Sequence, residues 1–200
     1  MVRSILSEIY FVTNNVNKYM EVKPIADKYG FKIIQHSGGK LEIQSNDLMK
    51  IAKISAIHAY MDLNKPVLVE DAGLFIYSLN GFPGPYSSYV YKTIGCSGIL
   101  KLLENTIDRR AKFVSAGVLI YEPFILTEVS EVEGYIADKP KGSSGFGFDP
   151  IFIPIGETRT FGEMSIEEKN KYSHRAKTVD KLFRKLRRIF DSEIYLNNEN

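Results

Sequence analysis

Residues 8–18 read EIYFVTNNVNK, a short β-favouring run that leads directly into a polar turn and a helix. The first six residues favour a strand, and Asn14, Asn15 and Asn17 make the following turn polar. Apolar side chains then recur at positions 22, 25, 26 and 29, the spacing of one helix face, and Gly30 suits the helix end. Strand, turn and helix in this order are typical of the start of an α/β unit.

Strands and helices keep alternating along the rest of the chain. Asp47 suits the cap of a second helix, and the last helix has apolar residues on one side and mostly Lys or Arg on the other. The pattern predicts an α/β fold or a mixed sheet with helices on both faces. In chain order, the further elements that we expect are a strand at 31–35, a helix at 47–62, strands at 67–70, 116–121 and 125–132, and a helix at 178–190.

The composition is that of one globular domain, or of two lobes that share a core, with 200 residues of which 44% are hydrophobic and 25% charged. The single cysteine, Cys96, cannot form an internal disulfide or a cysteine-rich zinc site, which indicates a reducing compartment and a cytoplasmic protein. No apolar run approaches the roughly 18 residues of a membrane span, and the first residues lack the pattern of a signal peptide. We therefore expect no association with a membrane.

Positive charge gathers near the C-terminal end, although the net charge of the chain is only +2. Residues 169–188 hold nine Lys or Arg and a single acid, Asp180. Such a run attracts anions, but a solvated helix face is the commoner explanation. The small net charge by itself gives no indication of a nucleic-acid-binding protein.

TNNVNK, residues 13–18, lies where the first expected strand gives way to the first helix. Backbone N–H groups at a helix N-terminus carry partial positive charge, and a hydroxyl, amides and the Lys18 ammonium beside them suit a polyphosphate. An ordinary Asn-rich turn with an N-cap explains the same residues. The GxxxxGK[ST] pattern is absent from the sequence, which excludes P-loop chemistry.

VLVEDAGLFI, residues 67–76, places two adjacent acids after a short apolar strand. Carboxylates at the carboxyl end of a strand lie where α/β sheets bind ligands, and they are suitable oxygen ligands for Mg²⁺. Glu70 and Asp71 should point to opposite faces and have different roles, and one of them could simply pair with a lysine. Glu42 is a candidate second metal ligand, although a lone Glu in a loop is more often solvated.

Two later segments add glycine, aromatic and basic residues. LNGFPGPYSSYV at 79–90 predicts a rigid turn, and SSGFGFDPIFIP at 143–154 flanks aromatic residues with glycines. Phe146 or Phe148 could stack on a flat base, with core packing as the alternative for either ring. EEKNKYSHRAK at 167–177 then supplies hydrogen-bond donors, and these are Lys169, His174 and Arg175.

The chain resembles the Ham1 or inosine triphosphatase family through segments in a fixed order: TNNVNK, VEDAGL, NGFPGPYS, GFGFDPIFIP, and FGEM followed by EEKNKYSHR. The resemblance implies an α/β fold in which an elongated mixed β-sheet is flanked by helices. Residues 1–200 would form a single domain of two lobes with a central nucleotide-binding cleft. It also implies a Mg²⁺-dependent homodimeric hydrolase that converts ITP, dITP and XTP into the nucleoside monophosphate and pyrophosphate.

The same resemblance assigns roles to residues. Asp71 matches the family's proton acceptor and metal-linked carboxylate, and Glu42 matches its other metal ligand. The sequence departs from the family's usual residues at Asn14, Ala72 and Phe148, and Ala72 cannot make a hydroxyl contact. The phosphate-binding residues that the resemblance implies are Thr13, Asn15, Lys18 and Lys53, and the base-binding residues are Phe146, Phe148, Asp149, Lys169, His174 and Arg175. Further substrate contacts are expected at Asn14, Val16, Asn17, Ala72 and Gly147.

The expected substrates share an oxygen at C6 of the base, where adenine carries an amino group. In their charged states Lys169, His174 and Arg175 donate hydrogen bonds but accept none, so adenine would leave an unmatched polar contact. Such a mismatch costs about 1–3 kcal/mol, or roughly a ten- to hundredfold preference. Guanine has the same oxygen, so these donors do not explain its rejection.

Two alternative functions have weaker support in the sequence. Maf-type nucleotide pyrophosphatases share the broad fold and prefer modified or pyrimidine nucleotides, but the SHR segment argues against them. The basic helix expected at 178–190 would fit a nucleic-acid-binding module, although core packing explains its interleaved apolar residues better.

Overall fold

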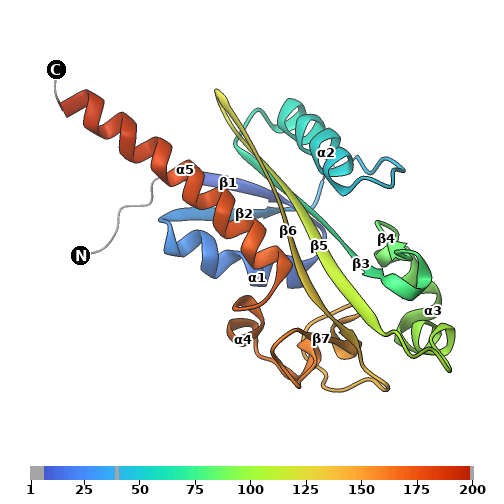
Figure 1. Cartoon of the computed structure of the whole chain (residues 1–200). Coiled ribbons are helices and arrows are strands. Elements are labelled where there is room, and N and C mark those ends of the chain that lie inside the picture. Colours follow the sequence, from blue (N-terminus) through green and yellow to red (C-terminus); the bar gives the residue numbers. More distant parts are fainter. Residues whose placement is uncertain (1–6, 39–40, 199–200) are drawn as a thin grey trace.

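The computed structural model describes residues 7–38 and 41–198, with the backbone alone for 193–198. In this part of the chain seven strands form one sheet in the order β2-β1-β3-β5-β6-β7, with β4 paired to β3 (Figure 1). The strands are β1 (Ser7–Val12), β2 (Phe31–His36), β3 (Val67–Ile76), β4 (Pro83–Gly84), β5 (Arg110–Tyr121), β6 (Phe124–Ile136) and β7 (Phe152–Pro154). The α-helices are α1 (Val16–Lys28), α2 (Leu48–Leu63), α3 (Ser87–Leu102), α4 (Ile166–Asn170) and α5 (His174–Asn198).

The sheet is mixed, as expected. β1 pairs in parallel with both β2 and β3, whereas every pairing from β3 through β5 and β6 to β7 is antiparallel. The parallel contact between β1 and β3 covers only Tyr10 with Val67 and Phe11 with Leu68. Beyond that point β3 continues beside β5 as far as Ile76. The structure therefore confirms the α/β fold with an elongated mixed β-sheet flanked by helices.

Strand β3 shows how the two faces of the sheet are covered. Leu68 belongs to a hydrophobic cluster with residues of α1 and α5, while its neighbours Val67 and Val69 pack with Ala52 of α2. Successive side chains of a strand point to opposite faces. Helices α1 and α5 therefore cover one face of the sheet and α2 covers the other (Figure 1).

A third hydrophobic cluster lies farther along the same strands. Leu74 of β3 and Phe113 of β5 pack there with Ile99 of α3 and Phe152 of β7. The rings of Phe113 and Phe152 meet edge to face, with centroids 4.7 Å apart. Glu70 and Asp71 thus lie on β3 between this cluster and the two clusters beneath α1, α5 and α2.

The acid pair on β3 lies within the strand, which corrects the expectation that the strand ends there. β3 continues to Ile76 because each of its residues from Val67 onward has a partner on β5. Glu70 and Asp71 instead lie just beyond the parallel contact with β1, whose own last residue is Val12. A strand end does adjoin the two acids, but it is that of β1.

The helices also differ in part from the expectations. The cap of α2 is confirmed, since the Asp47 side chain accepts hydrogen bonds from the N–H groups of Met49 and Lys50. The spacing of apolar residues in the sequence also predicts burial of Ile57 in α2, but the structure leaves this residue 48% exposed. The last helix begins at His174, four residues before the expected start. Helices α3 and α4 were not expected.

None of the described helices combines the length and the apolar composition needed to cross a bilayer. The interpretation of residues 1–200 as one domain of two lobes stays a prediction, since residues 1–6, 39–40 and 199–200 lie outside the described part of the chain.

Candidate active site

The turn between β1 and α1 presents Lys18 from the first turn of the helix. Asn15 caps α1, because its Oδ1 accepts hydrogen bonds from the N–H groups of Asn17 at 2.9 Å and Lys18 at 3.3 Å. The hydroxyl of Thr13 accepts from the N–H of Asn15 at 3.1 Å. Thr13 is buried, while Asn14, Val16 and Asn17 are exposed. The N-cap explanation of this turn is therefore correct, and a phosphate-binding role is compatible with it.

Glu70 is the carboxylate that holds Lys18 in place. The Nζ of Lys18 lies 2.9 Å from Oε2 of Glu70 and 3.2 Å from its backbone oxygen, and it lies 4.0 Å from Oδ1 of Asp71. Burial by itself raises the pKa of Glu70, but the nearby Arg175 and Lys18 have the larger combined effect and hold the pKa well below its ordinary value. Glu70 is therefore an ionised, fully paired residue, which leaves Asp71 as the acid with a partly exposed side chain, at 20%.

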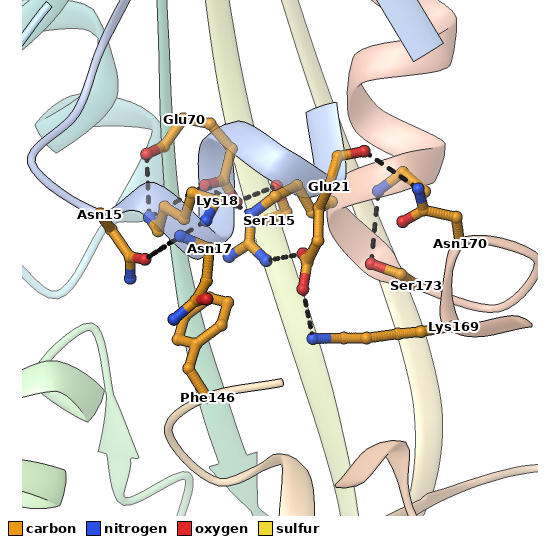
Figure 2. Close-up of polar contacts among 12 residues, drawn as sticks. Asn15, Asn17, Lys18, Glu21, Glu70, Ser115, Phe146, Lys169, Asn170 and Ser173 are labelled. Carbon is orange, nitrogen blue, oxygen red and sulfur yellow. Dashed lines mark hydrogen bonds and ion pairs between the residues drawn. The ribbon is translucent and has the colours of Figure 1, made fainter. Parts of the chain in front are cut away.

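A chain of buried ion pairs continues from Glu70 across α5 and α1 (Figure 2). Nε of Arg175 donates to Oε2 of Glu70 at 3.0 Å, and its NH1 donates to Oε2 of Glu21 at 2.5 Å. Nζ of Lys169 lies 2.6 Å from both Oε1 of Glu21 and Oδ2 of Asp149. The side chains of Lys169 and Arg175 are each only 3% exposed. The chain therefore links the Lys18 turn to the GFGFDP segment.

The charges within this chain balance, with Lys18, Lys169 and Arg175 opposite Glu21, Glu70 and Asp149. Burial raises the pKa of Glu21, but the nearby Arg175 and Lys169 lower it below its ordinary value. Burial raises the pKa of Asp149; Lys169 opposes this rise and Glu21 adds to it. Close pairing of opposite charges is what allows such groups to lie out of water.

The two phenylalanines of the GFGFDP segment have different surroundings. Phe146 is half-buried, and the cationic groups of Lys169 and Arg175 lie 5.0 Å and 5.3 Å from its ring centroid. Phe148 is buried in the third hydrophobic cluster, where it meets Tyr91 edge to face at 5.4 Å. Core packing therefore accounts for Phe148, whereas Phe146 lies beside the ion pairs. Gly147 between them is half-buried, and its carbonyl oxygen is 3.6 Å from the sulfur of Cys96.

His174 differs from the sequence-based picture of a charged donor. It is 2% exposed and stacks on Phe113, with ring centroids 4.6 Å apart. Burial, with a further contribution from Arg175, lowers its pKa well below 6.5. Its Nδ1 has no hydrogen-bond partner among the described residues. The imidazole is therefore neutral at pH 7, and of the three expected donors only Lys169 and Arg175 are cationic.

The expected metal ligands, Glu42 and Asp71, do not belong to a preformed set of metal-binding side chains in the described part of the chain. Within residues 7–38 and 41–198 no group of three or more His, Cys, Asp or Glu side chains is placed to hold a metal ion. Glu42 is exposed in the segment before α2. Mg²⁺ usually takes only one or two carboxylates and completes its shell with water and substrate phosphates. Asp71, partly exposed beside the Lys18 turn, fits that kind of site, whereas the paired Glu70 does not.

Two other expected substrate contacts lie outside the ion-pair chain. Lys53 is exposed on α2, which covers the face of the sheet opposite α5, and Ala72 is half-buried on β3.

Sequence reasoning missed Glu21, which is part of the ion-pair chain, and Ser115, which contacts that chain. Glu21 lies between Lys18 and Val22 on the buried face of α1, so its place next to the apolar residues was the available signal. The hydroxyl of Ser115 on β5 donates to Oε1 of Glu70 at 2.7 Å. Nothing in the local sequence around Ser115 indicates that contact.

A family model described as the Ham1 family matches residues 9–185, a range that includes every residue of the ion-pair chain. The chain belongs to the Ham1 family. Among the proteins similar to this chain, the dITP/XTP pyrophosphatase of Hyperthermus butylicus is 49% identical over 90% of this chain and 94% of that protein. The dITP/XTP pyrophosphatase of Saccharolobus solfataricus is 48% identical over 87% of this chain and 91% of that protein.

Solved structures of Ham1 proteins have the same fold. The HAM1 protein of Coxiella burnetii superposes with a TM-score of 0.80 at 31% identity, covering 90% of this chain and 98% of that one. The Ham1 protein of Staphylococcus aureus gives 0.75 at 29% identity, covering 93% and 99%. Membership of the Ham1 family confirms the resemblance drawn from the ordered sequence segments.

The basic face of α5 gives no support to the nucleic-acid alternative. Its apolar residues Val179, Leu182 and Leu186 are fully buried in the cluster with α1. Several of its cations are paired with acids, namely Arg184 with Asp180, Lys185 with Glu128 and Arg187 with Asp191. The Maf-type alternative is likewise not favoured, because the relatives described above are dITP/XTP pyrophosphatases.

Proposed function

We propose that this Ham1-family protein hydrolyses dITP, XTP and ITP to the nucleoside monophosphate and pyrophosphate. The observation that carries the proposal is the ion-pair chain, which ties Lys18 at the N-terminus of α1 to Lys169 beside Phe146. A helix N-terminus with a lysine suits the triphosphate, and cations beside an aromatic ring suit the base. The names of the relatives from Hyperthermus butylicus and Saccharolobus solfataricus support the same substrates.

The preference for a C6 oxygen has a physical basis in the donors of this site. Lys169 uses two of its three N–H groups on Glu21 and Asp149, and Arg175 uses two of its five on Glu70 and Glu21. The remaining N–H groups can donate to an oxygen at C6 but cannot accept from the amino group of adenine. A neutral His174 adds no positive charge to this discrimination.

The catalytic step that we propose centres on Asp71. Its carboxylate would accept the proton of the water that attacks the α-phosphorus, while Lys18 offsets charge on the phosphoryl oxygens. Mg²⁺ held by Asp71, with Glu42 as a second candidate ligand, would supply further charge neutralisation. Lys53 and the exposed Asn14, Val16 and Asn17 would complete the phosphate contacts.

We further propose a cytoplasmic homodimer. The single cysteine, which cannot form an internal disulfide, supports a reducing compartment. The homodimer follows from the resemblance to the family, and sedimentation analysis of the purified protein tests it.

The function is tested by incubating the protein with Mg²⁺ and each nucleotide and identifying the products. We expect IMP and pyrophosphate from ITP, with no IDP or orthophosphate as the first products. Release of orthophosphate, or equal turnover of ATP and ITP, would contradict the proposal. Omission of Mg²⁺ should abolish turnover.

The role of Asp71 is tested by Asp71→Asn. This variant should bind ITP nearly as well as the wild type while its kcat falls by orders of magnitude, because the amide cannot take a proton from water. Asp138→Asn is the control, since the Asp138 side chain is 94% exposed. Unchanged kcat in Asp71→Asn would remove Asp71 from the reaction.

A further inference from the structure

Ser115 lies within β5, fully buried, and contacts the ion-pair chain from the sheet. Its hydroxyl donates to Oε1 of Glu70 at 2.7 Å, whereas Oε2 of Glu70 accepts from Lys18 at 2.9 Å and Arg175 at 3.0 Å. The two oxygens of this carboxylate therefore have different partners. One is held by a neutral hydroxyl and the other is shared by two cations (Figure 2).

This division of partners fixes the orientation of the Lys18 ammonium. Two contacts of Nζ go to Glu70, one to Oε2 at 2.9 Å and one to the backbone oxygen at 3.2 Å. An ammonium has three N–H groups, so two contacts with one residue determine the direction of the third. Oδ1 of Asp71 lies 4.0 Å from the same nitrogen. The position of Oε2 thus determines how Lys18 faces the region beside Asp71.

Removal of the Ser115 hydroxyl would leave Oε1 as a buried carboxylate oxygen without a donor, which is energetically costly. The carboxylate would then turn so that both oxygens meet cationic donors. Arg175 presents a planar guanidinium that can bind two carboxylate oxygens at once. A turn toward Arg175 would draw Oε2 away from Lys18.

We propose that Ser115 is a positioning residue for the hydrolysis, acting through Glu70 to orient the Lys18 ammonium toward the substrate phosphates. The proposal rests on the proposed function, because ITP is the substrate that reports on Lys18. A second contact fixes the position of Ser115 relative to α5, since Oγ1 of Thr178 donates to the Ser115 carbonyl oxygen at 3.1 Å. Ser115 therefore lies where the sheet, the Lys18 turn and the helix carrying Arg175 meet.

The first experiment compares Ser115→Ala with Ser130→Ala. Ser130 lies opposite Ser115 on β6, is 6% exposed, and its hydroxyl has no hydrogen-bond partner among the described residues. We expect Ser115→Ala to lower kcat/KM for ITP by about tenfold or more and Ser130→Ala to change it by less than about twofold. Thermal unfolding of each variant identifies a temperature at which all of them are folded. If Ser115→Ala does not fold, Ser115→Cys replaces it, because a thiol is a weaker donor than a hydroxyl and should also lower kcat/KM, although by less than the full removal of the donor.

The second experiment asks whether the effect passes through Lys18. In a Lys18→Met background, measured by single-turnover hydrolysis of ITP, adding Ser115→Ala should change the rate by less than about twofold. Unchanged kcat/KM in Ser115→Ala, or an equal loss with and without Lys18, would overturn the proposal. A wild-type protein that releases no pyrophosphate from ITP would refute the proposed function and this inference together. An active wild type with an unaffected Ser115→Ala variant would refute the inference alone.

Discussion

Replacement of Glu21 by Gln tests the buried ion pairs directly. Glu21 receives Lys169 on one oxygen at 2.6 Å and Arg175 on the other at 2.5 Å, and all three side chains are 3% exposed. Gln keeps the shape of the side chain but removes its charge and points an NH₂ donor at a cation. The chain of three cations and three anions would then carry one unpaired positive charge. Breaking a buried pair in this way costs about 3–5 kcal/mol of the free energy of unfolding.

A matched control lies on the same helix. Lys23 and Asp27 of α1 form an ion pair at 2.6 Å, the same separation, but their side chains are 47% and 48% exposed. Asp27→Asn should therefore cost at most about 1 kcal/mol, because water solvates the charge that remains. The two losses are measured by urea unfolding followed by circular dichroism. Equal losses, or a loss below about 1 kcal/mol for Glu21→Gln, would refute the argument that burial sets the cost.

Three other expectations concern titration and packing. Burial raises the pKa of Glu21, but Arg175 and Lys169 lower it below 4.5, so its contribution to stability is present above that pH and is lost as the pH falls. The free energy of unfolding should fall below about pH 4.5, less steeply in Glu21→Gln than in the wild type, and identical slopes would contradict this. Burial raises the pKa of Cys96 from 9.0 to about 11, so iodoacetamide at pH 8 should label the folded protein about a hundredfold more slowly than the unfolded chain. Gly117→Ala would place a Cβ 2.8 Å from Leu182 and from Thr178 of α5, so thermal unfolding should show a loss of about 1–3 kcal/mol, and an unchanged Tm would contradict this.

Elements with strong local signals could be predicted from the sequence. Asp47 before an apolar run predicted α2, and the structure shows that side chain capping the helix. Gly30, expected at the end of α1, has a φ of 84°, which glycine adopts without strain. Helix α3 lacked such a signal, because only Ser87, Val90 and Ile99 of its sixteen residues are buried. So few buried positions do not produce a helical repeat of apolar residues that can be recognised in the sequence.

The candidate site was predictable where the motif residues themselves make the contacts. Lys18, Asp149, Lys169 and Arg175 were named from the sequence, and the structure brings all four into one ion-pair chain. Glu21 was not named from the sequence, because its partners Lys169 and Arg175 lie 148 and 154 positions away along the chain. The low pKa of His174 depends on tertiary burial, which no local pattern reports.

The length of the central strands determines how this molecule can move. β3 and β5 pass without interruption from the clusters under α1, α5 and α2 into the cluster near α3 and β7. A ligand that drew those two regions together would meet no flexible joint at Glu70 or Asp71. The strands themselves would have to coil more tightly, with each peptide taking a small share of the deformation. Such a motion would increase the twist of the sheet, and the backbone hydrogen bonds that join the two strands would limit its extent.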